Sequence, residues 1–344
     1  MLDALTQVVS SGPPLSAGQV REAVEQLVAE AVPASAKAEF LSALARRGET
    51  PEEIAGFARE LRQRSIRPPI DAATRERGII DVCGTGGDHH NTFNISTTVA
   101  LVVASAGVPV AKHGNRAVTS KSGSADVLEA LGIPVELSPE DAASMLRELD
   151  FAFFFAPRFH PAFRHIAPAR RLCAERGQRT VFNFLGPLLN PAEPMAQLMG
   201  VPQPGLCAPL AHVLQDLGLR RGMVVSGQTP AGHLDELSTV GDSVIAEFHH
   251  QRGFSVSTLS LQSLPVQPTV LADLAGGDRD QNAAIIRQIL SGQETGPKRD
   301  GVLLNAGAAL FVAGRARSIL DGWDLAAQLI DSGKAAAKLA QLQR

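Results

Sequence analysis

The chain has 344 residues, of which 44% are hydrophobic and 19% are charged, and its formal net charge at pH 7 is −3. This composition is typical of a globular protein, and the length is enough for one large domain or two smaller ones. The weak negative charge gives the surface no basic field, which argues against a nucleic-acid partner.

Cysteines and apolar runs bear on the compartment in which the protein works. Cys83, Cys173 and Cys207 are far apart and odd in number, so they fit neither a disulfide framework nor metal-ligand spacing. The N-terminal residues do not show the basic segment followed by an apolar core that is typical of a signal peptide. The longest apolar run, residues 99–111, is interrupted and too short to span a bilayer. We therefore expect a cytoplasmic protein without a membrane partner.

The first part of the chain predicts helices only. Capping boxes at Ser16 and at Thr50 each precede apolar residues that lie on one helix face. The sequence Arg67-Pro68-Pro69 then ends the helical pattern and is typical of a linker. We expect a small helical domain over residues 1–68.

From Gly78 onward the pattern changes to alternating strands and helices. Strands are predicted at residues 79–82, 108–111, 133–136 and 151–155. Helices are predicted between them at residues 96–106, 124–131 and 138–150, and residues 112–123 are predicted to form a loop. Repeated units of this kind imply a mostly parallel central sheet flanked by helices. The fold class is therefore α/β, with a large domain over residues 76–344 after the helical one.

The remainder of the large domain is less regular. A basic segment at about residues 157–178 is expected to form helices that join the N-terminal domain, while Arg176 and Arg179 are expected to be solvated. Further strands are predicted at residues 181–184, 198–201 and 223–225, with a hairpin at 244–248 and 254–258. Helices are predicted again at residues 281–291, 299–313, 317–332 and on to about 342.

A glycine-rich loop, Gly84-Thr85-Gly86-Gly87-Asp88, follows the first predicted strand. Glycines permit positive φ and leave backbone N–H groups uncovered, and the N-terminus of the helix that Asn94-Ile95-Ser96-Thr97 opens adds more. The loop therefore favours phosphate binding, although an ordinary glycine-rich turn is the alternative. Asp88 cannot attract a phosphate, so it indicates contact with sugar hydroxyls or Mg²⁺.

Two further polar segments belong with this loop. Lys112-His113-Gly114-Asn115-Arg116 and the following Ser120-Lys121-Ser122-Gly123-Ser124 come after the second strand, at the same edge of the sheet, and supply cations and hydroxyls. Asp235 and Glu236 are adjacent carboxylates after the strand at 223–225, and oxygen ligands of this kind bind Mg²⁺. Alone, such a pair is usually solvated surface.

Seven motifs of the chain, GTGGD, NTFNIST, KHGNR, SKSGSADVLEALG, FNFLGPLLNP, LDELS and GGDRDQNAAI, together resemble the anthranilate phosphoribosyltransferase family. They occur in order over nearly the whole chain. The resemblance implies a small helical domain joined to a large α/β domain, and a homodimer formed through the helical parts. It also implies transfer of the phosphoribosyl group from phosphoribosyl pyrophosphate (PRPP) to the amine of anthranilate, with a pair of Mg²⁺ ions in each subunit.

The resemblance also implies roles for individual residues. The implied PRPP contacts are Gly84, Gly87, Asp88, Thr92, Asn94, Ile95, Ser96, Thr97, Lys112, His113, Gly114, Asn115, Arg116, Ser120 and Ser124. The implied anthranilate contacts are Gly84, Asn115 and Arg170, with His113 nearby, and the implied Mg²⁺ ligands are Ser96, Asp235 and Glu236. Residues 172–178 are about three longer than the family's usual turn, which is tolerable in a loop. No residue is assigned as a general acid or base.

Two rival functions share this fold. A pyrimidine nucleoside phosphorylase would use phosphate in place of pyrophosphate and would not need the Asp235–Glu236 pair. A non-enzymatic, nucleic-acid-binding relative would show a basic groove and altered substrate loops, whereas here the charge is negative and each loop is intact.

Overall fold

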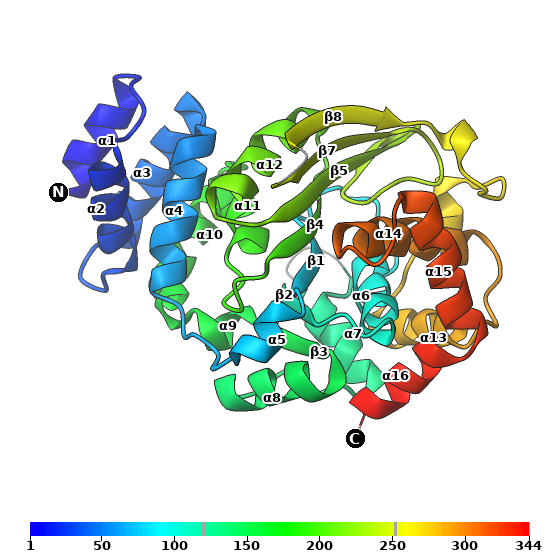
Figure 1. Cartoon of the computed structure of the whole chain (residues 1–344). Helices are drawn as coiled ribbons and strands as arrows, with labels where there is room; N and C mark the ends of the chain where they lie inside the picture. The colour runs from blue at the N-terminus through cyan, green and yellow to red at the C-terminus, as the bar shows by residue number, and fades with distance from the viewer. Residues whose placement is uncertain (118–120, 251–252, 344) are drawn as a thin grey trace.

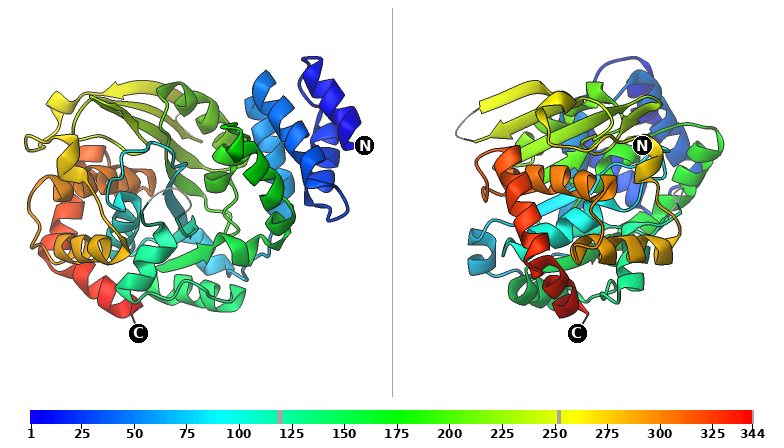
Figure 2. Two further views of the ribbon diagram at one scale, coloured as in Figure 1. Left: turned by 180° about the vertical axis from the view of Figure 1, so that it is seen from behind. Right: turned by 90° about the vertical axis from the view of Figure 1, so that its right-hand side faces the viewer.

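The computed structural model describes residues 1–117, 121–250 and 253–343. Within these residues an all-helical segment is followed by an α/β segment, and the views in Figures 1 and 2 agree in placing the N-terminal helices at one end of the molecule and the last helices at the other. This arrangement confirms the predicted fold class. None of the helices in the described ranges is long and apolar enough to cross a bilayer.

Four helices form the N-terminal segment: α1 (Leu2–Ser10), α2 (Ala17–Val28), α3 (Ala34–Arg47) and α4 (Pro51–Gln63). Both predicted capping boxes are present, since Ser16 accepts a hydrogen bond from the Gln19 amide and Thr50 accepts one from the Glu53 amide. The apolar face of α2 is buried as its spacing predicted. Local sequence therefore determines where these helices begin and which face they bury.

The α/β segment contains eight strands in the described residues: β1 (Ile80–Gly84), β2 (Val110–Gly114), β3 (Phe151–Phe155), β4 (Ala196–Gly200), β5 (Arg221–Thr229), β6 (Gly232–Leu234), β7 (Ser243–His249) and β8 (Gly253–Leu259). Their order is β3-β2-β1-β4-β5-β7-β8, and β6 pairs with β5. The pairs β3–β2, β2–β1, β1–β4 and β4–β5 are parallel, whereas β5 is antiparallel to β6 and β7, and β7 is antiparallel to β8. The expected hairpin is thus present at one edge.

Twelve α-helices accompany this sheet in the described residues. They are α5 (Ala72–Glu76), α6 (Ile95–Ser105), α7 (Ser124–Leu131), α8 (Pro139–Leu149), α9 (Ala156–Phe159), α10 (Ala167–Glu175), α11 (Phe182–Leu188), α12 (Cys207–Asp216), α13 (Arg279–Leu290), α14 (Pro297–Val312), α15 (Ile319–Asp331) and α16 (Lys334–Leu342). The four C-terminal helices occur where the sequence predicted them. The basic segment is helical, and its α10 packs against α3 of the N-terminal segment.

Each face of the sheet belongs to a different apolar core. Alternate strand residues such as Val82, Leu198 and Val225 pack with α6 and α13–α16. Residues one position away, such as Met199 and Val224, pack instead with α11, α12 and the N-terminal helices. The sheet is therefore covered on both sides, as parallel sheets require.

The chain order creates a crevice at the carboxyl ends of β1 and β4. After β1 the chain continues to β2 and β3 on one side, and it returns to form β4 on the other side of β1. In open α/β sheets such a switch point is where ligands bind. The glycine loop leaves β1 at this point, and the Thr85 amide donates to the Gly200 carbonyl at 3.0 Å.

Three local predictions were wrong. Residues 133–136 form no strand: Ile133 and Val135 are buried, but β2 is already paired on both sides and Pro134 cannot donate. Residues 181–184 begin helix α11, because a short apolar run buried on all sides is compatible with either structure. Residues 112–114 extend β2 instead of forming a loop, because they pair with residues 153–155 of β3.

Candidate active site

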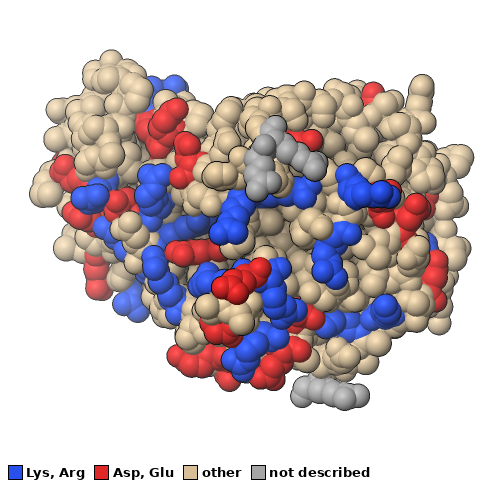
Figure 3. All heavy atoms as spheres, in the orientation of Figure 1, with Lys and Arg blue, Asp and Glu red and all other residues tan. Residues whose placement is uncertain are grey.

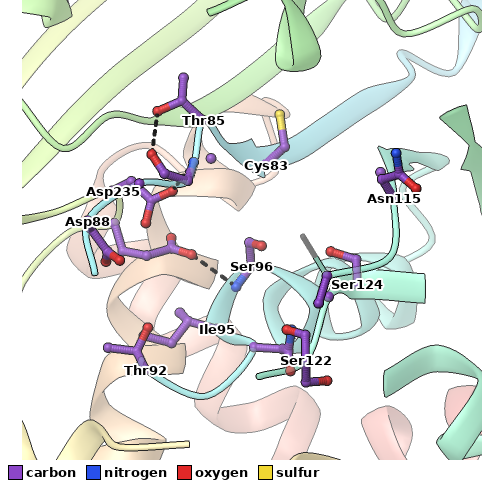
Figure 4. A pocket seen from close by; sticks show the side chains of 18 of the residues that line it. Cys83, Thr85, Asp88, Thr92, Ile95, Ser96, Asn115, Ser122, Ser124 and Asp235 are labelled. Atoms are coloured by element: carbon purple, nitrogen blue, oxygen red, sulfur yellow. Dashed lines mark hydrogen bonds between the residues drawn. The ribbon is translucent and has the colours of Figure 1, made fainter. Parts of the chain in front are cut away.

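A cavity of about 510 Å³ opens at the carboxyl ends of β1 and β2. Its walls come from the glycine loop, the start of α6, the end of β2 with the segment after it, the start of α7, and the acidic pair that follows β6. Figure 4 shows Asp88 and Asp235 on one side of this space, Asn115 and Ser124 on the other, and Ser96 between them. The three segments that the sequence singled out therefore meet in one cavity.

Positive φ angles shape the glycine loop. Gly86 has φ of 71° and Gly87 has φ of 83°, and His89 and Asn91 also lie in the left-handed region. Glycine adopts this conformation without steric cost, which is the property expected for these positions. Gly84 has a different role: a Cβ there would overlap the carboxylate of Asp235. The loop and the acidic pair are thus packed directly against each other.

The two acidic side chains accept hydrogen bonds from the expected phosphate-binding amides. The Gly86 amide donates to Asp235 Oδ2 at 2.8 Å, and the Ser96 amide at the start of α6 donates to Glu236 Oε1 at 3.1 Å. The amides that were expected to bind phosphate therefore already orient two carboxylates. The helix N-terminus attracts negative charge of either kind, which is why Glu236 can occupy it.

Burial makes the ionised forms of these carboxylates costly. Burial, followed by the negative charge of Asp88, raises the pKa of Asp235 to about 7. Burial and the neighbouring Asp235 raise the pKa of Glu236 well above its ordinary value, although the positive charge of Lys112 opposes this. Three acids in one cavity therefore favour the arrival of a cation.

Lys112 lies in the cavity lining, and the buried Asp81 interacts with its positive charge. Lys112 Nζ donates to the Val82 carbonyl at 2.7 Å and to Ser96 Oγ at 3.3 Å. Burial raises the pKa of Asp81 to about 6, against the opposing charge of Lys112. Asn190 donates to Asp81 at 2.9 Å and to the Ala111 carbonyl at 2.7 Å. Neither Asp81 nor Asn190 was predicted from the sequence to have a role, although an acid within an apolar strand is a usable signal.

The segment after β2 is held by a network of ion pairs. Arg116 pairs with Glu129 at 2.6 Å and with Glu136 at 3.1 Å. Asp126 of α7 accepts from the amides of Ala117 and Gly123, both at 2.9 Å. This network fixes the backbone on both sides of residues 118–120, and Ser120, one of the expected PRPP contacts, lies outside the described residues.

His113 is a neutral histidine in the cavity wall. Its Nδ1 lies 3.1 Å from the Gly186 carbonyl, and because a carbonyl only accepts, Nδ1 carries the proton. Burial, and then the neighbouring His160 at 5.3 Å between ring centroids, lowers the pKa of His113 to about 3. The side chain therefore carries no charge toward an anionic ligand.

Most of the predicted site residues line this cavity. They are Gly84, Gly87, Asp88, Thr92, Asn94, Ile95, Ser96, Lys112, His113, Gly114, Asn115, Arg116, Ser124, Asp235 and Glu236. Thr97 does not line it and is fully buried. Arg170 also lies outside the lining, on α10, with its guanidinium 5.3 Å from the centroid of the Phe182 ring.

The donor set at the acidic side fits a hard divalent cation. Asp88, Asp235 and Glu236 offer carboxylate oxygens and Ser96 offers a hydroxyl, which are the ligand types that Mg²⁺ prefers. In the described residues no three His, Cys, Asp or Glu side chains are placed to hold a metal by themselves. A cation here would need oxygens from a bound substrate or from water, as Mg²⁺ sites on phosphorylated substrates usually do.

Comparison with known proteins defines the class. Residues 3–65 match the helical bundle domain of the glycosyl transferase family, and residues 76–336 match the a/b domain of that family. The chain is therefore a glycosyl transferase of the two-part type that the fold describes.

Individual relatives narrow the class to one family. The chain is 45% identical to an anthranilate phosphoribosyltransferase of Symbiobacterium thermophilum over 99% of this chain and 97% of the relative. It is 48% identical to that of Moorella thermoacetica over 98% of this chain and 96% of the relative. The chain belongs to the anthranilate phosphoribosyltransferase family.

Solved structures of this family agree with the fold. The anthranilate phosphoribosyltransferase of Thermus thermophilus superposes with a TM-score of 0.89 at 41% identity, covering 98% of each chain. The Saccharomyces cerevisiae enzyme in complex with PRPP and Mg superposes with a TM-score of 0.88 at 26% identity, covering 99% of this chain and 96% of the other. The similarity thus extends over the helical and the α/β segments together.

Proposed function

We propose that this chain is a pentosyltransferase that transfers the phosphoribosyl group of PRPP to the amine of anthranilate. The products are N-(5-phosphoribosyl)anthranilate and pyrophosphate, which is the second step of tryptophan biosynthesis from chorismate. The observation that carries this proposal is the meeting of the glycine loop, the segment after β2 and the Asp235–Glu236 pair in one cavity at the switch point of the sheet.

PRPP occupies this cavity in the proposal. Its pyrophosphate lies over the glycine loop, where Gly87 leaves the backbone uncovered and the cation-binding acids are adjacent. The other expected PRPP contacts are Gly84, Asp88, Thr92, Asn94, Ile95, Ser96, Thr97, Lys112, His113, Gly114, Asn115, Arg116, Ser120 and Ser124. Of these, Thr97 acts through the position of α6, because its side chain is buried away from the cavity.

Mg²⁺ binds at Ser96, Asp235 and Glu236 in the proposal, with a pair of ions in each subunit. When bound, the cations neutralise charge on the pyrophosphate group. The protein supports them through the Gly86 amide, which fixes the Asp235 carboxylate, and through the Ser96 amide, which fixes that of Glu236. Because these carboxylates repel one another, the cations also relieve a cost that the free protein bears.

Anthranilate binds beside PRPP, against Gly84, His113, Asn115 and Arg170. Because His113 is neutral and Asn115 carries an uncharged amide, the guanidinium of Arg170 is the charged partner for the carboxylate of anthranilate. Arg170 does not line the cavity in this structure, so its guanidinium has to move from its place beside Phe182 toward the cavity for this contact to form.

The reaction is a displacement at the anomeric carbon of the ribose. The bond from that carbon to the pyrophosphate oxygen breaks, and the lone pair of the anthranilate nitrogen forms the new bond. That nitrogen then releases one proton to solvent to give the secondary amine product. The amine is weakly basic and its lone pair is free, so no general base is assigned at the start. The protein contributes position and electrostatic stabilisation of the leaving group.

One assay tests the proposed function. Purified protein is mixed with PRPP, Mg²⁺ and anthranilate, and the loss of anthranilate fluorescence is followed. We expect signal loss that requires all three, together with release of pyrophosphate. Cleavage of a pyrimidine nucleoside by phosphate, without anthranilate turnover, would instead establish the phosphorylase alternative. Binding of nucleic acid with neither reaction would establish the non-enzymatic alternative. That alternative predicts a basic groove, whereas Figure 3 shows Lys and Arg interspersed with Asp and Glu on the face that it draws.

The assembly and compartment belong to the same proposal. Residues 1–68, together with the helices at about 157–178, form one domain, and residues 76–344 form the phosphoribosyl-binding domain. Lys37 of α3 supports this division by donating to the His165 carbonyl at 2.9 Å. The protein is a cytoplasmic homodimer that pairs through the helical domain. Light scattering after size exclusion should give twice the 36.2 kDa mass of the chain.

A further inference from the structure

The cavity contains little cationic charge that is free to reach a ligand. Its charged lining consists of Lys112 and Arg116 against the three acids Asp88, Asp235 and Glu236. Lys112 is buried and donates to Val82 and Ser96, while Arg116 is paired with Glu129 and Glu136. A substrate with a pyrophosphate group therefore needs positive charge from bound cations and from side chains outside this lining.

Arg179 brings such a charge to the glycine loop. The loop's Gly87 lies so near that a Cβ built on it would be 3.3 Å from Arg179 Nη2. The Arg179 side chain is exposed, and among the described residues its guanidinium has no hydrogen-bond or ion-pair partner. A guanidinium presents several N–H donors in a fork that matches phosphate oxygens. Arg179 is therefore solvated, as the sequence predicted, but its guanidinium also lies beside the glycine loop.

The backbone around Arg179 is fixed while its side chain is free. On one side the Gln178 amide donates to the Cys173 carbonyl at 2.9 Å. On the other side the Thr180 amide donates to Asn183 Oδ1 at 2.9 Å, at the start of α11. Gln178 Nε2 also donates to the Arg179 carbonyl at 2.9 Å. The guanidinium is thus held near the Gly86–Gly87 turn without being committed to another group.

We propose that the guanidinium of Arg179 binds the pyrophosphate group of PRPP where that group lies over the Gly86–Gly87 turn. This assignment rests on the proposed function and adds a substrate-binding residue to it. Arg179 thereby supplies from outside the cavity the charge that Lys112 and Arg116 are not free to supply. It is expected to stay with the leaving group as negative charge develops on it, and to have no contact with anthranilate.

The test compares Arg179→Gln with wild type by calorimetric titration of inorganic pyrophosphate in the presence of Mg²⁺. We expect the pyrophosphate affinity to fall about tenfold, the lower end of the effect of a charge-assisted hydrogen bond, because this side chain is exposed. The KM for PRPP should rise by a similar factor, and the KM for anthranilate should stay the same. Arg179→Lys should recover part of the loss, since it keeps the charge without the fork.

Arg176→Gln is the matched control, because Arg176 is another exposed arginine of the same segment whose side chain has no partner among the described residues. It should leave the pyrophosphate affinity unchanged. Titration with ribose 5-phosphate should show no difference between Arg179→Gln and wild type. Unchanged pyrophosphate affinity, or an equal loss for ribose 5-phosphate, would overturn the assignment. Wild type that binds pyrophosphate but fails to convert anthranilate and PRPP would instead contradict the proposed function.

Discussion

Asp235 and Glu236 are unfavourable for the stability of the free protein, yet the proposed Mg²⁺ site requires them. Their carboxylates are buried, and the Asp235 backbone packs so closely on Gly200 that a Cβ there would overlap it. When the pKa of an acid is higher in the folded protein than in the unfolded chain, the free energy of unfolding falls as pH rises from the unfolded pKa toward the folded pKa. Above about pH 7 the free protein therefore carries the full cost of Asp235.

Changing both residues, Asp235→Asn with Glu236→Gln, removes charge and keeps shape. We expect turnover to fall about a hundredfold or more, because charge stabilisation by a metal ion is worth several kcal/mol. The melting temperature at pH 8 without Mg²⁺ should not fall, and its rise on addition of Mg²⁺ should be lost. Asp324→Asn, an exposed acid on α15, is the control. Wild-type turnover at every Mg²⁺ concentration would mean that the pair does not bind the metal.

Arg170 and Arg171 test the assignment of the anthranilate carboxylate. Adjacent residues on α10 point about 100° apart, so only one of them can face the cavity. A bidentate charge-assisted pair is worth roughly 1.5–3 kcal/mol, or about tenfold to a hundredfold in affinity. Arg170→Ala should raise the KM for anthranilate by about that factor and leave that for PRPP nearly unchanged, while Arg171→Ala should affect neither. The reverse result would show that the insertion at residues 172–178 has shifted the register by one.

At the scale of elements, the proposed phosphate-binding role of the glycine loop depends on its backbone conformation. Gly86 has φ of 71° and open space around it, so a Cβ would strain the backbone without a clash. Gly86→Val should turn the loop out of the left-handed region and remove the amide from Asp235, with loss of PRPP binding by calorimetry. The melting temperature should change little, and Gly12→Val, a similar strain far from the cavity, should leave binding intact. A large loss of stability with binding retained would identify the loop as a structural turn.

The elements that sequence predicted well are those with strong local signals. Capped helices such as α2 and α4, and the long C-terminal helices, depend on spacing and capping within one segment. The strand predicted at residues 133–136 failed because its environment is set by the order β3-β2-β1, which local sequence does not encode. The same holds for residues 181–184, whose burial on all sides hides the helical period.

The site shows the same division between local and long-range information. The three polar segments could be found in sequence because glycines, acids and cations stand out beside apolar strands. The Asp81–Lys112–Asn190 network could not, because the Asn190 to Asp81 hydrogen bond joins residues 109 positions apart. The proximity of Arg179 to Gly87 is likewise a product of the tertiary fold.

At the scale of the whole molecule, one short segment joins the helical and the α/β parts. Consecutive carbonyls at the end of α11 accept from His113 at 3.1 Å, from Gln197 at 2.8 Å and from Arg62 of α4 at 2.5 Å. His160 lies beside them, in ring contact with His113 at 5.3 Å between centroids and with Phe163 at 5.2 Å. The junction between the two parts therefore contains two buried histidines.

This junction predicts sensitivity to acid. Burial lowers the pKa of His160 to about 4, although its bond to the Leu189 carbonyl opposes the change, and the pKa of His113 is lowered to about 3. Between these values and the ordinary histidine pKa, the unfolded chain binds more protons than the folded one, so stability falls as pH falls. Asp81 and Asp235 act in the opposite direction, because their raised pKa values favour the folded state at lower pH. The wild-type slope is thus a sum of opposing contributions.

A difference between variants isolates one histidine from that sum. His160→Phe should lower stability by a constant amount for the lost hydrogen bond, but it should also remove one titrating group. Between about pH 4 and pH 6.5 its free energy of unfolding should therefore fall less steeply toward acid than that of wild type, by about 1.4 kcal/mol per pH unit. Phe163→Leu disturbs the same ring packing without removing a titrating group, so it should shift the curve with little change of slope. Urea unfolding at a series of pH values measures the stability of wild type and of the two variants. Parallel curves for His160→Phe and wild type would show that folding does not lower the pKa of His160.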